Sequence, residues 1–297
     1  MKIRYLTRSE IDTGRWDICV EQSINPMLYA KSWYLDIVSP DWAGLVGDDY
    51  KAVMPLPKRY KWGIPYFNQP PYCQQLGLFS SLETESDLID CFIEKIPFRP
   101  YRLKINYCHR PKNCIEQPNY VLSLYDSYEV IAKGFNKNTL RNINKAQHRG
   151  VVVKVYHLLT QSDSSSNISI ADIFLDFYLS VSKPYNAPNN RIISQLLTDG
   201  YRRGEVDFRL AYNSKNEPIA GLALLLSTKR LIYLCPISNT EGKAMSAMFL
   251  IINDIIHNYA QTDTLLDFEG SAIESIARFY RGFGAELEPY FLIKRFL

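Results

Sequence analysis

The sequence lacks several features that mark common classes of protein. Its longest apolar runs, GLALLL and AMFLII, are much shorter than the roughly 20 residues that span a bilayer. The first ten residues, MKIRYLTRSE, contain no apolar stretch of the kind found in secretion signals. The six cysteines include no CxxC pair, and the four histidines lack the spacing of metal ligands. We therefore expect a cytoplasmic protein with reduced thiols, no membrane span and no metal.

Acidic residues are missing from one stretch of the chain. Residues 131–150, IAKGFNKNTLRNINKAQHRG, contain no acid, and cations recur at every fourth position: Lys133, Lys137, Arg141, Lys145 and Arg149. On one helix this spacing would form a single cationic stripe, although like charges so placed cost about 0.2–0.5 kcal/mol per pair. The formal net charge is +3, so removing the five cations leaves about −2 for the rest. Positive charge is therefore local, which argues against binding to DNA and favours one focused anion site.

The chain of 297 residues is long enough for two domains of ordinary size. Apolar patterns follow the same order in both halves: strand, helix, helix, hairpin, strand, helix, strand, strand. Sequence identity between the halves is slight, so the repeat exists only as a pattern. We predict an α/β fold with domains at 1–126 and 150–297, joined by a basic linker helix at 127–149.

This order of elements resembles the GNAT superfamily of acyltransferases, and tandem copies joined by a basic segment resemble its FemABX-like branch. The stretch NQPPYCQQLGLFS is similar to a signature of that branch, and KNTLRNINKAQHRGVVV resembles its basic segment. In that segment Leu140 stands where the first of two adjacent arginines is common, and Arg141 keeps the second. The resemblance implies two tandem GNAT-like domains with mixed, mainly antiparallel sheets. The first domain would shape the acceptor site, and the second would bind the donor and carry the chemistry.

The resemblance places a donor site at the turn before the helix predicted at residues 243–259. GNAT enzymes hold the pyrophosphate of coenzyme A with a loop of the form Gln/Arg-x-x-Gly-x-Gly/Ala. The corresponding residues here are Asn239, Gly242, Lys243 and Ala244. Helix N-terminal amides attract an anion, and small residues let it approach closely. A plain helix start explains the same residues without a ligand.

The resemblance also places the acyl group beside the strand at 231–237, whose backbone amides would stabilise the oxyanion. Pro236 has no amide and cannot continue a regular central ladder, so it would mark the point at which this strand separates from its neighbour. The alternative is a proline on an edge strand.

Tyr280 is the candidate general acid. GNAT enzymes that use coenzyme A often carry a tyrosine on their last helix shortly before a glycine, as Tyr280 stands before Gly284. Its phenol would protonate the leaving thiolate. FemABX peptidyltransferases often have Phe-Lys where this chain has Phe279 and Tyr280, so the missing lysine favours acyl-CoA slightly over aminoacyl-tRNA as the donor. The alternative is a half-buried packing residue.

Glu269 is the candidate base or ligand for the substrate amine. Asp267 and Glu269 alternate with apolar residues in the stretch DFEG, so they share one face of a strand. Glu269 is preferred because it is nearest the strand's C-terminal end. The alternative is that these carboxylates pair with Lys294 or Arg278.

The remaining candidates would contact the substrates. In the first half, polar and aromatic side chains cluster around the family signature: Trp33, Lys58, Arg59, Gln69, Gln74 and Gln75. Glutamine amides offer both donors and acceptors to a sugar or peptide, although surface hydration explains each residue singly as well. Tyr185 lies in the loop SKPYNAPNN, and Arg141 and Lys145 are the cations expected to meet a phosphate-bearing ligand.

Together these residues predict an N-acyltransferase that moves an acyl group to a small-molecule or peptide amine by direct attack. Acyl-CoA would be a co-substrate, with no tightly bound cofactor. One alternative is a FemABX-type peptidyltransferase that uses aminoacyl-tRNA and extends a peptidoglycan precursor. Another is a binding module that kept the fold without the chemistry.

Overall fold

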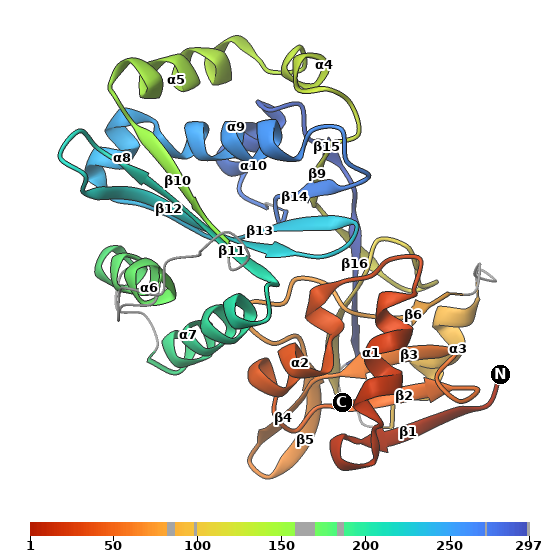
Figure 1. Ribbon diagram of the computed structural model, residues 1–297. Coiled ribbons are helices and arrows are strands. Elements are labelled where there is room, and N and C mark those ends of the chain that lie inside the picture. Colours follow the sequence, from red (N-terminus) through yellow and green to blue (C-terminus); the bar gives the residue numbers. More distant parts are fainter. Residues whose placement is uncertain (82–86, 98–99, 158–169, 183–186, 271, 296–297) are drawn as a thin grey trace. The chain divides into compact units, whose positions relative to one another are not determined.

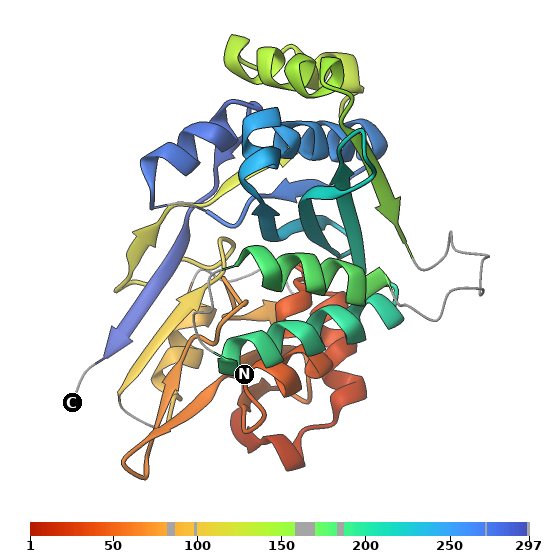
Figure 2. The same ribbon diagram turned by 90° about the vertical axis from the view of Figure 1, so that its left-hand side faces the viewer.

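The computed structural model describes residues 1–81, 87–97, 100–157, 170–182, 187–270 and 272–295, without the side chains of 187–188. The chain divides into two compact units (Figures 1 and 2). Unit 1 consists of Met1–Asn119 together with Glu288–Leu297, and unit 2 of Tyr120–Leu287. The predicted basic linker at 127–149 is thus part of unit 2, and the last strand of the chain is part of unit 1.

Unit 1 contains two sheets. The first is antiparallel, in the order β1-β2-β3-β6, with strands β1 (Ile3–Thr7), β2 (Ala43–Gly47), β3 (Ala52–Leu56) and β6 (Phe79–Ser80). Between β1 and β2 lie η1 (Arg8–Glu10), α1 (Thr13–Glu21), η2 (Leu28–Ala30) and α2 (Ser32–Val38). The side chain of Asp12 caps α1 by accepting from the amide of Arg15, as a short acidic residue commonly does at this position.

The second sheet of unit 1 includes, as an interior strand, the strand that the structure describes last in the sequence. Its order is β4-β5-β7-β16-β8, formed by β4 (Lys58–Lys61), β5 (Ile64–Asn68), β7 (Tyr101–Ile105), β16 (Tyr290–Arg295) and β8 (Ile115–Gln117). The pair β5–β7 is parallel and the other pairs are antiparallel. On β7 the alternate residues Tyr101, Leu103 and Ile105 are buried, and helix α3 (Leu88–Glu94) adds Phe92 to the same core.

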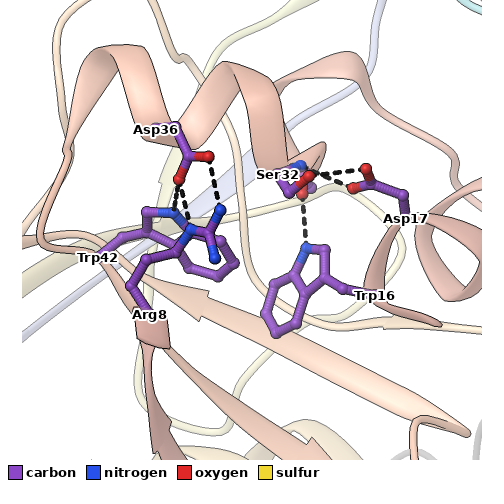
Figure 3. Close-up of polar contacts among 7 residues, drawn as sticks. Arg8, Trp16, Asp17, Ser32, Asp36 and Trp42 are labelled. Carbon is purple, nitrogen blue, oxygen red and sulfur yellow. Dashed lines mark hydrogen bonds and ion pairs between the residues drawn. The ribbon is translucent and has the colours of Figure 1, made fainter. Parts of the chain in front are cut away.

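Carboxylates fix helix α2 onto its surroundings in unit 1 (Figure 3). Asp36 accepts from Arg8 Nε at 2.6 Å and from Trp42 Nε1 at 2.8 Å. Asp17 accepts from both the amide and the hydroxyl of Ser32, each at 2.7 Å. Burial alone would raise the pKa of Asp36, but the hydrogen bonds from Arg8 and Trp42 outweigh it and lower that pKa. The start of α2, which carries the candidate Trp33, is therefore held in place by Asp17 of α1.

Unit 2 is built on one seven-stranded sheet in the order β10-β11-β12-β13-β14-β9-β15. Its strands are β10 (Val152–Tyr156), β11 (Val206–Tyr212), β12 (Pro218–Leu226), β13 (Arg230–Ser238), β14 (Leu265–Asp267), β9 (Tyr120–Ser123) and β15 (Glu286–Leu287). The pair β13–β14 is parallel, whereas the other pairs are antiparallel. The fold prediction of mixed, mainly antiparallel sheets with flanking helices is confirmed.

Helices cover both faces of this sheet (Figures 1 and 2). Helices α6 and α7 pack on one face of β11, and α9 packs on the other. In chain order the helices are α4 (Tyr128–Ala132), α5 (Lys137–His148), α6 (Ile170–Val181), α7 (Ala187–Arg202), α8 (Thr240–Met245), α9 (Ala247–Tyr259) and α10 (Glu274–Arg281). Among the described residues, none of the helices is long and apolar enough to cross a membrane.

The basic stretch is not one continuous helix. Helix α4 ends at Ala132, and α5 begins after Asn136, whose side chain caps it by accepting from the amide of Thr139 at 2.8 Å. Helix α5 packs against α9 through a buried face that includes Ile143 and Ala146. The expected five-residue stripe is therefore interrupted after Lys133, because an asparagine cap starts a new helix.

Candidate functional site

The two parallel strands of unit 2 separate where the chemistry was predicted. Strand β13 pairs with β14 only from Arg230 to Ile232, and β14 ends at Asp267. The rest of β13, from Tyr233 to Ser238, continues beside β12 without a partner in β14. The separation thus begins after Ile232, before Pro236. Backbone amides on that side of β13 are the groups that an oxyanion would need.

Strand β13 also contains a β-bulge. Between Leu234 and Ile237 it advances one residue more than β12 does between Ala223 and Gly221. Cys235 takes up the extra residue with a φ of 54°, a left-handed conformation that is uncommon for side chains other than glycine. Pro236, next in the chain, is exposed. The proline thus lies at an irregular point of an interior strand rather than on an edge strand.

Cys235 lies at the candidate site but was not among the predicted site residues, since the cysteines were expected only to be reduced thiols. Burial raises the pKa of its thiol, and the nearby carboxylate of Glu269 raises it further. The thiol therefore stays protonated and is unsuited to nucleophilic attack. The Cys-Pro pair within an apolar strand was the available signal.

Tyr280 and Glu269 lie together beyond the end of β14. Tyr280 is only 6% exposed, and its ring stacks on Phe268 with a centroid distance of 4.6 Å. Burial raises the pKa of its hydroxyl, and the charges of Glu269 and Asp267 raise it further. The phenol is therefore protonated at neutral pH and able to donate. Glu269 is half-buried with a φ of 53°, so its backbone is turned out of the extended strand conformation.

Asp267 has a structural role. Its carboxylate lies 2.7 Å from Arg230 Nη1 in a fully buried ion pair, and it accepts from the amide of Glu269 at 2.9 Å. The suggested pairing with Lys294 or Arg278 is wrong for this residue, whose partner is Arg230. By holding the backbone of Glu269, Asp267 positions the side chain that we regard as the candidate base.

The predicted donor turn is explained by capping and packing. Asn239 caps α8 by accepting from the amide of Gly242 at 2.8 Å. A Cβ atom on Gly242 would lie 2.8 Å from the carbonyl carbon of Ile219 in β12 and closer still to its oxygen. Lys243 and Ala244 are exposed. Pyrophosphate binding at this turn stays a prediction, because a glycine is required here even without a ligand.

Two cations of α5, Arg141 and Lys145, were predicted to meet a phosphate-bearing ligand. Arg141 donates to Asn138 Oδ1 at 2.8 Å and is exposed, and Lys145 is half-buried. Within the described part of the chain, no carboxylate forms an ion pair with either residue. The charge pattern also allows an alternative in which carboxylates of a neighbouring domain clamp the stripe, and these contacts do not support it.

The predicted glutamines hold the loop that follows β5. Gln69 donates to the carbonyl of Cys73 at 3.0 Å and accepts from the amide of Lys104 at 3.1 Å. Gln75, fully buried, accepts from the amide of Tyr107 and donates to Gln74 at 2.7 Å. The amide groups of Gln69 and Gln75 thus satisfy buried polar atoms of unit 1, and a substrate contact through them stays a prediction.

The other predicted substrate residues are placed as follows. Trp33 lies on α2 with its ring centroid 5.4 Å from that of Tyr34. Lys58, at the start of β4, is half-buried and hydrogen-bonded to the side chain of Tyr5. Tyr185 lies outside the described residues. Trp33 and Lys58 belong to unit 1, whereas Glu269 and Tyr280 belong to unit 2.

Comparison with known proteins finds likeness in structure alone. No protein-family model and no curated protein matches the sequence. The structure of FemX is similar with a TM-score of 0.65 at 10% identity, covering 98% of this chain and 97% of that one. The C-terminal domain of a putative lysylphosphatidylglycerol synthetase from Agrobacterium fabrum is similar with a TM-score of 0.60 at 11% identity, covering 97% and 92%.

A third similar structure is L-PGS from Bacillus licheniformis, with a TM-score of 0.56 at 10% identity and coverage of 96% of this chain and 92% of that one. These likenesses extend over both units of the chain. They show that the chain has a GNAT/FemX-like fold, which confirms the predicted resemblance at the level of structure.

Proposed function

We propose that this protein is an N-acyltransferase whose chemistry takes place in unit 2, where β13 separates from β14. The observation that supports this most directly is that the buried hydroxyl of Tyr280 lies within electrostatic reach of the carboxylate of Glu269, next to the part of β13 that has no partner in β14. An acid, a base and oxyanion donors are the three groups that direct acyl transfer needs. The FemX-like fold supports the same class of reaction.

In the proposed reaction the lone pair of the acceptor amine attacks the acyl carbonyl, and a C–N bond forms. Amides of β13 between Tyr233 and Ser238 stabilise the oxyanion. The bond from carbon to the leaving group then breaks, and Tyr280 gives its proton to the departing thiolate. Glu269, or a water molecule that it orders, takes the proton of the amine. No covalent enzyme intermediate is formed.

We favour acyl-CoA as the donor, because Tyr280 suits a leaving thiolate and stands where peptidyltransferases of the resembled branch often have lysine. The second candidate is an aminoacyl-tRNA-dependent peptidyltransferase, and the overall likeness to FemX supports it. The cations of α5, Arg141 and Lys145 among them, would serve either donor, since both carry phosphate. Transfer of label from acetyl-CoA compared with charged tRNA, to a panel of amines, distinguishes the two.

The Tyr280→Phe variant tests the acid role. It keeps the ring that stacks on Phe268, so folding should be intact while kcat falls by roughly 10²–10⁴-fold, the usual contribution of a positioned acid. The matched control is Tyr125→Phe, which removes a hydroxyl from a residue of the same unit that is 71% exposed. Unchanged activity of Tyr280→Phe would show that this assignment is wrong.

The Glu269→Gln variant tests the base in the same way, with the exposed Glu274→Gln as its control. We expect a loss of kcat that a more basic pH partly restores, because the amine then loses its proton to solvent. Calorimetry with coenzyme A gives an independent measure of donor binding, and no heat with any donor would favour a non-catalytic binding module.

A further inference from the structure

The hairpin formed by β4 and β5 presents large apolar side chains to solvent. Trp62 is 89% exposed, Tyr60 56% and Ile64 53%. With Lys61, Tyr66 and Pro100, Trp62 and Ile64 line an open hollow of about 450 Å³ on one face of the hairpin. In both views the turn points away from the other strands of its sheet (Figures 1 and 2). Trp62 and Ile64 expose apolar area beside this hollow, whereas Tyr60 lies on the opposite face of the hairpin, because Lys61 pairs with Ile64 and Tyr60 with Pro65. Bulky apolar residues gathered at one tip mark an interaction site more often than scattered residues do.

The conformation of Trp62 is unfavourable for a tryptophan. The two-residue turn places Trp62 at a φ of 53° and Gly63 at 78°, the left-handed pair of a type I′ turn. Asparagine or aspartate before glycine is the preferred sequence of such a turn, whereas a bulky residue there is strained. Hairpin formation alone would therefore favour asparagine at position 62. The geometry of the turn thus does not explain the tryptophan.

The charge around this tip has one sign. Residues 50–82 contain no Asp or Glu. Arg59 and Lys61 are exposed, and within the described part of the chain neither forms an ion pair. The ammonium of Lys61 lies 4.6 Å from the ring centroid of Trp62. Cations on a short edge strand also discourage pairing between sheets, but that role needs no tryptophan at a strained turn.

We propose that this hairpin docks unit 1 onto the surface of an anionic lipid bilayer. Trp62, Tyr60 and Ile64 enter the interfacial region, where tryptophan and tyrosine are preferred, and Arg59 and Lys61 contact anionic headgroups. Charge complementarity favours an anionic surface over a neutral one. The proposal does not depend on the transferase reaction: of the residues predicted to contact substrate it uses only Arg59, and it uses neither Glu269 nor Tyr280.

The test is binding of the full chain to vesicles of phosphatidylglycerol and phosphatidylcholine in equal parts, compared with phosphatidylcholine alone. Intrinsic fluorescence reports mainly on the tip, because Trp16 and Trp42 are fully buried and Trp33 is half-buried, whereas Trp62 is open to solvent. We expect a blue shift and co-sedimentation with the anionic vesicles only, both weakened by salt. Absence of binding to anionic vesicles at low salt would overturn the proposal.

Two variants separate docking from folding. Trp62→Asn should keep or raise the stability of the protein, because asparagine suits the turn, while it weakens vesicle binding by about tenfold or more. Arg59→Glu with Lys61→Glu should weaken binding by about 25-fold or more, taking about fivefold for each cation lost. The matched control is Lys137→Glu with Arg149→Glu, the same charge change on exposed residues of the basic stretch in unit 2.

The results for these variants show which partner binds the hairpin. Binding lost in both hairpin variants and kept in the control supports the proposal. Binding lost only in the control would assign the lipid contact to the α5 region and overturn it. Hairpin variants that bind vesicles normally but lose affinity for a single-stranded oligonucleotide would show a nucleic-acid surface instead. A wild-type dimer that Trp62→Asn converts to a monomer would show a self-interface.

Discussion

Gly242→Ala distinguishes the two explanations of the turn before α8. If the glycine is required by packing, the substitution destabilises the protein without any ligand. The new Cβ would lie 2.8 Å from the carbonyl carbon of Ile219, against 3.4 Å for an ordinary contact, so the helix must move by at least 0.6 Å. Overpacking of this kind costs about 1–3 kcal/mol, and the obstruction here is backbone in an interior strand, so the upper end applies.

The higher helix propensity of alanine offsets at most about 1 kcal/mol of this loss. We therefore expect the free energy of unfolding to fall by about 2 kcal/mol and the Tm of unit 2 by roughly 4–8 °C. Urea and thermal unfolding followed by circular dichroism measure both. The control is Lys243→Ala, an exposed position in the same turn. A Gly242→Ala protein as stable as the control, with weaker coenzyme A binding, would refute the packing argument and support a pyrophosphate site.

Three further predictions concern stability. Burial lowers the pKa of His109 to about 4, below the usual value of about 6.5, so the unfolded chain takes up a proton that the folded chain does not. The free energy of unfolding should thus fall by up to about 3 kcal/mol as the pH is lowered from about 6.5 to 4. Urea unfolding should show a smaller fall in His109→Gln than in the wild type. An equal fall in the two proteins would contradict the argument. Arg230→Met should lower the free energy of unfolding by about 3–5 kcal/mol, because it leaves the buried carboxylate of Asp267 without its partner. Adding Asp267→Leu should recover most of this loss. Additive losses of the two substitutions in denaturant unfolding would exclude coupling between them. Because the pKa of Asp36 is lowered in the folded protein, its carboxylate adds stability above about pH 4 that is lost as the pH falls through the folded pKa. The Asp36→Asn variant should lack this acid-dependent component when unfolding is measured at several pH values.

Local patterns in the sequence were sufficient to predict the type and order of most helices and strands. Alternating apolar residues are visible in β7, and α6 has the helical spacing of apolar residues. The single helix expected at 243–259 is divided into α8 and α9 at Ser246, whose φ is 61°. The break between α4 and α5 was also visible, since Gly134 and Asn136 are typical of a helix end followed by a cap. It was missed because the regular spacing of the cations took precedence over these two residues.

Long-range pairing could not be predicted in the same way. Nothing local distinguishes a strand that pairs within its own half from β9 or β16, which pair with the other half of the sequence. The candidates Glu269 and Tyr280 were placed together by resemblance, whereas the strained Cys235 and the buried partners of Gln69 depend on tertiary contacts that periodicity does not encode.

The position of β16 has a consequence for the order in which the protein is made. Its residues lie between β7 and β8 in the sheet, but they leave the ribosome after all of unit 2. A nascent chain that ends at residue 287 would have β7 and β8 without their shared neighbour, so their facing edges would be open. Unit 1 is thus expected to finish folding only after unit 2 has been made, while unit 2 can fold earlier. A fragment made from residues 1–119 alone would keep these open edges and be prone to aggregate, whereas adding residues 288–297 as a separate peptide should complete the sheet.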